Sequence, residues 1–156
     1  QGWTPPAGSK SVEELKQIVS WAQRPFILKG IMTARGAEKA LEAGASGIVV
    51  SNHGGRVLDH CPATAEVLPE IVDAVGGKLA IFVDGAIRSG MDMFKALALG
   101  ADAVLIGRPF VTTIYGGGEE GVQLYVQKLK AELADTMRMC GAHSLAEIKR
   151  SMLFGF

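Results

Sequence analysis

Short apolar runs alternate with longer stretches of helical period along the chain of 156 residues. The four runs lie at residues 26–29, 47–51, 79–84 and 103–107. Each run is followed by a polar or glycine-rich turn, and strands that are apolar throughout are typical of parallel sheets buried on both faces. The three stretches between them, with apolar residues at three- and four-residue spacing, lie at residues 34–43, 63–75 and 91–99. That spacing is typical of amphipathic helices, so the pattern predicts consecutive βα units.

Helices are also predicted before the first run and after the last. Ser11 and Glu14 have the capping-box spacing, in which each side chain accepts a hydrogen bond from the backbone N–H of the other. A long helix over residues 121–139 is followed by a short one that begins at Ser144, again with capping-box spacing. The glycines at 116–118 lack the Lys-Ser/Thr of a phosphate-binding P-loop, so we interpret them as a flexible connector.

Two architectures use consecutive βα units: a doubly wound open sheet and the closed (β/α)₈ TIM barrel. The phrases at 42–50 and 98–106 repeat the sequence of helix end, glycine and strand, so the units are related to one another. A full barrel needs about 250 residues, and four units are about half of one. A half barrel exposes two strand edges and an apolar interior, so it must pair with another half. We expect a lead segment and first helix over residues 1–25 and the four units over 26–156.

The charge balance and the cysteine content of the chain indicate which partners and which location to expect. The chain has 16 Lys and Arg against 16 Asp and Glu, and this balance predicts no nucleic-acid partner and no membrane partner. Its only cysteines, Cys61 and Cys140, form no CxxC pattern, which predicts neither a disulfide framework nor a zinc site and favours a cytoplasmic location. The chain begins at Gln1 with a Gly/Pro-rich lead, and we expect it to be a piece of a longer protein.

Candidate chemistry collects where the predicted strands end, because the loops there converge over one face of a parallel α/β fold. The second strand ends in Ser51 and is followed by Asn-His-Gly-Gly-Arg. His53 carries the side chain that most readily accepts a proton near neutral pH, and Arg56 offers a planar guanidinium that can grip a carboxylate with two hydrogen bonds. The alternative is a loop histidine beside a turn with a surface arginine.

The other strands end in a second group of candidates: Lys29, Asp84, Gly85, Arg88, Gly107 and Arg108. Lys29 either points into an active site, where it would stabilise an anion, or extends to the rim of the sheet. The two glycine-bearing turns that carry Arg88 and Arg108 match the phosphate site that barrels build after their last two strands. The alternative is that Asp84 caps a helix and that both arginines are solvated.

Several phrases together resemble one family. They are LKGI at 28–31, VSNHGGRVLD at 50–59, PAT at 62–64, LPE at 68–70, FVDGAIR at 82–88 and KALALGADAVLIGRP at 95–109. This set resembles the C-terminal half of the FMN-dependent α-hydroxy acid oxidase and dehydrogenase family, which includes glycolate oxidase, lactate oxidase and flavocytochrome b2. SNHGGR followed by LD is the most specific phrase. The resemblance runs from about residue 26 to 154 and implies that the four predicted strands are strands 5 to 8 of a TIM barrel.

The resemblance also implies a reaction and a cofactor. A flavoprotein oxidoreductase of this family uses FMN to convert a small 2-hydroxy acid, such as lactate or glycolate, to the 2-keto acid. His53 would take the hydroxyl proton while the C2 hydrogen goes to flavin N5 as hydride, or alternatively by a carbanion route. Arg56 would hold the substrate carboxylate, and Lys29 would stabilise the reduced flavin. The residues implied to bind the cofactor are Lys29, Ser51, Asp84, Gly85, Arg88, Gly107 and Arg108.

The chain departs from the family pattern in three places and lacks one half of the barrel. Ala86 stands where the family usually has a second glycine, which we expect to crowd the phosphate loop, and His60 and Cys61 replace small residues. The N-terminal half of the family supplies strands 1 to 4, active-site tyrosines and the aspartate that orients the histidine. The resemblance therefore implies that a separate chain or fragment completes the site, in an enzyme that forms a homo-oligomer.

The residues alone leave two other functions open. One is a noncatalytic half barrel that self-associates and binds flavin or phosphate through Arg88 and Arg108. The other is a doubly wound nucleotide-binding sheet, which the lack of GxGxxG after any predicted strand disfavours.

Overall fold

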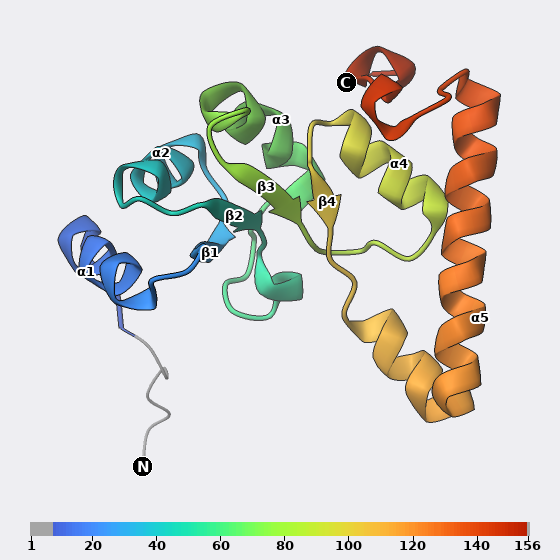
Figure 1. Ribbon diagram of the computed structural model, residues 1–156, viewed down its shortest axis with the longest axis horizontal. Coiled ribbons are helices and arrows are strands. Elements are labelled where there is room, and N and C mark those ends of the chain that lie inside the picture. Colours follow the sequence, from blue (N-terminus) through green and yellow to red (C-terminus); the bar gives the residue numbers. More distant parts are fainter. Residues whose placement is uncertain (1–7, 156) are drawn as a thin grey trace.

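Four parallel strands alternate with helices in the computed structural model, which describes residues 8–155 (Figure 1). The strands are β1 (Ile27–Ile31), β2 (Gly47–Val50), β3 (Ala80–Val83) and β4 (Ala103–Val104). The helices are α1 (Val12–Ala22), α2 (Ala34–Glu42), α3 (Thr64–Val75), α4 (Gly90–Ala98), α5 (Arg108–Cys140) and the short 3₁₀ helices η1 (His53–Gly55), η2 (Leu145–Glu147) and η3 (Arg150–Met152). The predicted βα alternation is confirmed, and the first seven residues of the predicted lead segment lie outside the described residues.

The strand order in the sheet is β1-β2-β3-β4, with every described neighbour pair parallel. Each strand therefore pairs with the next one in the chain. A doubly wound sheet reverses its order at a switch point, whereas consecutive strands of a barrel follow one another around it. The order of these four strands is that of a barrel segment.

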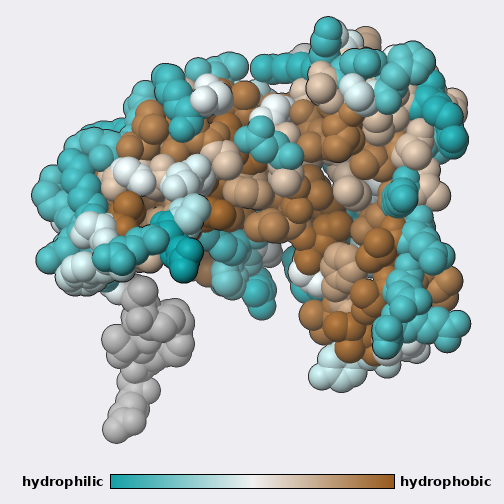
Figure 2. Space-filling view, viewed as in Figure 1, coloured by the Kyte–Doolittle hydropathy of each residue, from teal (hydrophilic) through white to brown (hydrophobic). Residues whose placement is uncertain are grey.

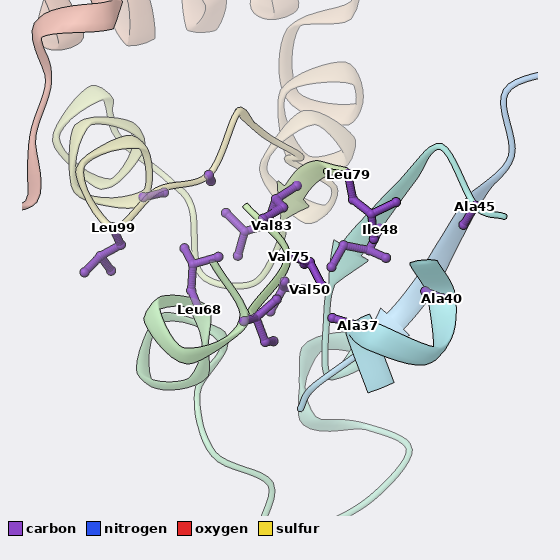
Figure 3. Packing of buried hydrophobic residues seen from close by; sticks show 14 residues of the cluster. Ala37, Ala40, Ala45, Ile48, Val50, Leu68, Val75, Leu79, Val83 and Leu99 are labelled. Carbon is purple, nitrogen blue, oxygen red and sulfur yellow. The ribbon is translucent and has the colours of Figure 1, made fainter. Parts of the chain in front are cut away.

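One face of the sheet carries the hydrophobic core. Leu28, Ile48 and Ile81 are partners in register, and the two isoleucines are fully buried. They pack against α2 and α3, whose buried side chains meet those of the strands (Figure 3). Each of the two buried isoleucines contributes about 1.5–3 kcal/mol through removal of its apolar surface from water.

The opposite face of the sheet points away from these helices. Lys29, Val49 and Phe82 are in register on this face, since successive strand residues alternate between faces. Ile27 and Leu105, which also alternate onto it, keep 46% and 41% of their surface exposed. Figure 2 shows apolar side chains spread over the middle of the molecule, from the strands toward α5. This face corresponds to the interior of a complete barrel.

A bulge in β1 places Lys29 and Ile31 on opposite faces of the sheet. The register with β2 shifts between Lys29 and Ile31, and the residue between them, Gly30, has φ +95°, a conformation that side chains rarely adopt. Ile31 consequently turns to the helix side and packs against the core. Lys29 stays on the open face, at the end where the loops converge.

Helix α5 consists of two segments joined at Gly118, whose φ of 55° and ψ of −140° lie outside the helical region (Figure 1). Of the connector predicted at 116–118, only Gly118 joins two segments, because Gly116 and Gly117 belong to the first segment. The second segment packs against α4 through a small cluster around Phe94 and Ala98. None of the described helices has both the length and the low polarity needed to cross a membrane.

The two predicted capping boxes differ in outcome. At α1 the box is confirmed, since Glu14 N–H donates to Ser11 Oγ at 3.1 Å and Ser11 N–H donates to Glu14 Oε2 at 2.7 Å. At Ser144 it is wrong, because the segment folds as the one-turn helix η2 and the hydroxyl of Ser144 accepts no capping bond. The Glu147 carboxylate accepts instead from the backbone N–H of His143 at 2.9 Å.

Candidate active site

A cavity of about 740 Å³ lies where the strands end. Eight residues predicted from the sequence line it: Lys29, His53, Arg56, Asp84, Gly85, Arg88, Gly107 and Arg108. The ninth, Ser51, is buried, and its hydroxyl oxygen accepts a hydrogen bond from Lys29. They meet because the carboxyl ends of neighbouring parallel strands lie at one edge of the sheet. Among the lining residues that the sequence did not indicate, Tyr125 and Lys128 come from the second segment of α5.

Lys29 points into the cavity and is held there by two polar partners. Its ammonium group pairs with the carboxylate of Asp84 and donates a hydrogen bond of 2.7 Å to Ser51 Oγ. These contacts favour the cavity over the rim alternative for Lys29. The helix-cap alternative for Asp84 is wrong, because α4 is capped by Ser89, whose Oγ accepts from Asp92 N–H at 3.1 Å.

The loop after β2 is fixed by the residues that precede His53. Ser51 Oγ accepts from the backbone N–H of His53 at 3.1 Å, and Asn52 Oδ1 accepts from Gly55 N–H at 3.2 Å. His53 itself has φ 55°, in the left-handed region. Arg56 follows with its Nε 3.4 Å from the His53 carbonyl oxygen. These bonds present the imidazole and the guanidinium to the same cavity.

One end of the cavity is suited to an anion. Arg88, Arg108 and Lys128 all line it. The backbone N–H groups at 85–87 and 106–107 donate to no backbone acceptor among the described residues, and no side chain caps the start of α5. Free N–H groups, a helix N-terminus and guanidinium groups are the donors that bind phosphate in proteins. Arg88 and Arg108 are exposed, as the alternative of two solvated arginines expects, and both also line this cavity.

Two further features bear on a ligand in this cavity. Asp84 Oδ1 is buried and has no hydrogen-bond partner within the described part of the chain. Buried acceptors in native proteins are nearly always satisfied, so this atom calls for a donor such as a ligand hydroxyl group. Ala86, where a glycine was expected, is exposed and adopts φ 59°, a conformation that glycine adopts without strain.

Ionisable groups behind the Arg88 turn have shifted pKa values. Burial opposes ionisation of Asp92, but hydrogen bonds from the Ser89 hydroxyl and from the N–H groups of Arg88 and Ser89 outweigh it and lower the pKa of Asp92. The hydrogen bond from Lys128, followed by that from Gly90 N–H, lowers the pKa of Glu132. Burial raises the pKa of Tyr125.

The fold and the cavity together define an α/β barrel segment whose strands end at a cavity lined by groups suited to an anion. The sequence places it in a family: residues 6–154 match the model of the FMN-dependent dehydrogenases, and the chain belongs to this family. The resemblance read from the sequence motifs is thereby confirmed.

Named relatives agree with this assignment. The chain is 49% identical over 142 residues to a peroxisomal (S)-2-hydroxy-acid oxidase from Oryza sativa subsp. japonica, a match that covers 91% of this chain and 38% of the relative. It is 46% identical over 143 residues to glycolate oxidase 3 from Arabidopsis thaliana, covering 92% and 39% of the two chains. The chain thus spans less than half the length of these relatives.

A solved structure of mandelate oxidase with 3,3-difluoro-2-hydroxy-3-phenylpropionic acid has a similar fold. Its TM-score is 0.86 at 43% sequence identity, and the match covers 90% of this chain and 43% of that one. The four βα units therefore correspond to part of the barrel region of that mandelate oxidase.

Proposed function

We propose that this chain supplies the proton acceptor, the substrate-carboxylate site and the phosphate end of the cofactor site in an FMN-dependent 2-hydroxy acid oxidase or dehydrogenase. The observation that carries the proposal is the meeting of Lys29, His53 and Arg56 with two anion-binding turns in one cavity. Family membership supports FMN as the cofactor and 2-hydroxy acids as the substrate class.

The residues present fit FMN. The unpartnered Asp84 Oδ1 can accept from a ribityl hydroxyl, and Arg88, Arg108 and the free N–H groups at 106–107 can hold the phosphate. Gly107 has open space where a side chain would begin, so backbone can approach a phosphate there. When bound, FMN supplies the acceptor for two electrons and the hydrogen from C2 of the substrate.

The side chains of this chain would divide the remaining tasks. The guanidinium of Arg56 binds the substrate carboxylate through two parallel hydrogen bonds and so orients the adjacent C2. A ring nitrogen of His53 takes the proton of the 2-hydroxyl group while the C–H bond at C2 breaks, which leaves the 2-keto acid. Lys29, fixed by Ser51 and Asp84, places a positive charge where negative charge develops.

The open face of the sheet supports a second half barrel as the partner. Ile27, Phe82 and Leu105 on that face are at least partly exposed, although a barrel buries such positions. We infer that the N-terminal half of the barrel covers this face, as a separate chain or as another part of the same protein, and that the complete enzyme forms a homo-oligomer. The cytoplasmic location stays a prediction, and one of the relatives above is named peroxisomal.

Substitution of His53 by alanine tests the proposal in the complete protein. The variant should keep bound FMN but lose its reduction by lactate or glycolate, because no other described histidine lines the cavity. His60→Ala is the matched control, since the side chain of His60 is 95% exposed, and it should reduce FMN at the wild-type rate. Wild-type reduction of the flavin in His53→Ala would contradict the proposed role.

Arg56→Lys tests the carboxylate site separately. Lysine keeps the charge but not the two-pronged geometry, so KM should rise by about tenfold while kcat changes less. An unchanged KM would remove Arg56 from the substrate site. A protein that holds FMN but is reduced by no 2-hydroxy acid would favour the noncatalytic half barrel.

A further inference from the structure

The turn that carries Arg88 is attached to the second segment of α5 at two points. The hydroxyl of Tyr125 donates to the carbonyl oxygen of Arg88 at 3.0 Å. Two residues after Arg88, where the turn ends and α4 begins, the N–H of Gly90 donates to Glu132 Oε2 at 2.9 Å. Both acceptor–donor pairs join residues far apart in the sequence, so they fix the turn relative to a separate helix.

The contact at Gly90 leaves no room for a side chain. A Cβ atom on this buried glycine would lie 2.1 Å from the backbone nitrogen of Leu133 and 2.6 Å from the backbone carbon of Glu132. The start of α4 therefore lies directly against the backbone of α5. This close packing sets the distance between α5 and the end of the Arg88 turn at Gly90.

Tyr125 also connects the turn to the first segment of α5. Its ring lies edge-to-face on Phe110, with centroids 5.1 Å apart and an interplanar angle of 74°. Phe110 lies in the first turn of the helix, which begins at Arg108 beside the cavity, and its N–H donates to the carbonyl of Gly107 at 3.0 Å. A single side chain thus links the Arg88 turn, which it contacts through its hydroxyl group, to the first helical turn after Gly107, which it contacts through its ring.

We propose that Tyr125 is a positioning residue that holds the two phosphate-binding turns at a fixed separation. The inference rests on the proposed function, in which the phosphate of FMN occupies this end of the cavity. Tyr125 itself lines the cavity, but its hydroxyl group is committed to the Arg88 carbonyl and acts through that turn. Its contribution therefore concerns recognition of the phosphate and not of the flavin ring.

The test compares two flavins on the complete protein after removal of its flavin. FMN carries the phosphate and riboflavin lacks it, and the quenching of flavin fluorescence gives the Kd of each. Tyr125→Phe keeps the ring contact and removes only the hydroxyl group, and it should weaken FMN binding about fivefold. Its Kd for riboflavin should stay within about twofold of wild type, because the lost hydrogen bond acts on the phosphate turn alone.

Tyr115→Phe is the matched control, because Tyr115 is the other tyrosine of the chain and is 90% exposed. It should leave both affinities unchanged. Tyr125→Leu removes the ring contact as well and should weaken FMN binding further, still with the smaller effect on riboflavin.

The outcomes separate this inference from the function on which it rests. If Tyr125→Phe binds FMN as wild type does, the positioning role is overturned and the proposed function stands. If it loses FMN and riboflavin affinity equally, Tyr125 serves only the general fold and the positioning role is again overturned. If the wild-type protein does not prefer FMN to riboflavin, the phosphate site itself is wrong, and the proposed function fails with it.

Discussion

The carboxylate of Asp92 holds the turn on which Arg88 sits. One of its oxygens accepts from the N–H groups of Arg88 and Ser89, each at 3.0 Å, and from the Ser89 hydroxyl at 2.8 Å. The Ser89 hydroxyl in turn accepts from the N–H of Asp92. This reciprocal cap starts α4 and fixes the backbone immediately before it, so a carboxylate that does not line the cavity shapes the turn that carries Arg88.

The lowered pKa of Asp92 makes this cap sensitive to acid. Because its pKa is lower in the folded than in the unfolded protein, its contribution to stability is full above the ordinary pKa near 4 and is lost as the pH falls through the lower, folded value. Asp92→Asn should be less stable than wild type at pH 7 by about 1 kcal/mol. Urea unfolding at several pH values should show this difference shrinking below about pH 4.

The exposed carboxylate of Asp135 offers the control for this prediction. It pairs only with Arg138 on the same helix, and both side chains are largely exposed, so Asp135→Asn should change stability little at any pH. A constant difference between Asp92→Asn and wild type from pH 7 to pH 3 would contradict the account of the cap.

At the scale of single residues, the sequence predicted cavity-lining residues that lie in the segments just after the strands. His53, Asp84 and Arg108 were found in this way, because parallel strands bring their carboxyl ends together whatever the details of packing. Tyr125 was missed because it lies within a helix, far from any strand end. Its only signal was the glycine triplet before it, which we interpreted as a connector.

Among the elements, α5 decides how the cavity is closed on one side. Its first segment begins at the end of the cavity that Arg88 and Arg108 line, and its second segment returns past α4 after the break at Gly118 (Figure 1). The break requires a backbone conformation that residues with a Cβ atom avoid. The reversal of the chain at this glycine is what brings Tyr125 and Lys128 to the cavity.

Two neighbouring glycines in α5 should respond to alanine with opposite signs. Gly117 is helical and has open space around its missing Cβ, so Gly117→Ala should raise the free energy of unfolding by about 0.5–1 kcal/mol through helix propensity. Gly118 also has open space, but its φ of 55° with ψ of −140° strains any side chain, so Gly118→Ala should lower it by about 1–3 kcal/mol. Urea denaturation of both variants gives the two values.

The pair is its own control, because the two positions are adjacent and neither substitution meets a neighbouring atom. Stabilisation by both alanines would mean that α5 runs straight through residue 118. Tyr125 would then lie elsewhere, and its contact with the Arg88 turn would need another explanation.

For the molecule as a whole, the order and direction of the strands could be predicted from the sequence. The arrangement of the C-terminal helices could not. Four apolar runs with helices between them leave few arrangements, and their sequential order in the sheet selects the barrel segment. The kink at Gly118 and the one-turn form of η2 depend on packing against α4 and on local hydrogen bonds. Apolar periodicity carries no information about either.

We propose that the cavity belongs to a flavoenzyme that oxidises 2-hydroxy acids. The most direct test is the visible absorption spectrum of the purified complete protein, recorded without oxygen before and after addition of glycolate, lactate or mandelate, with every chain identified by intact mass. At least one of these acids should bleach the flavin band, as the proposal requires. A full complement of bound FMN that none of the three acids reduces would contradict it.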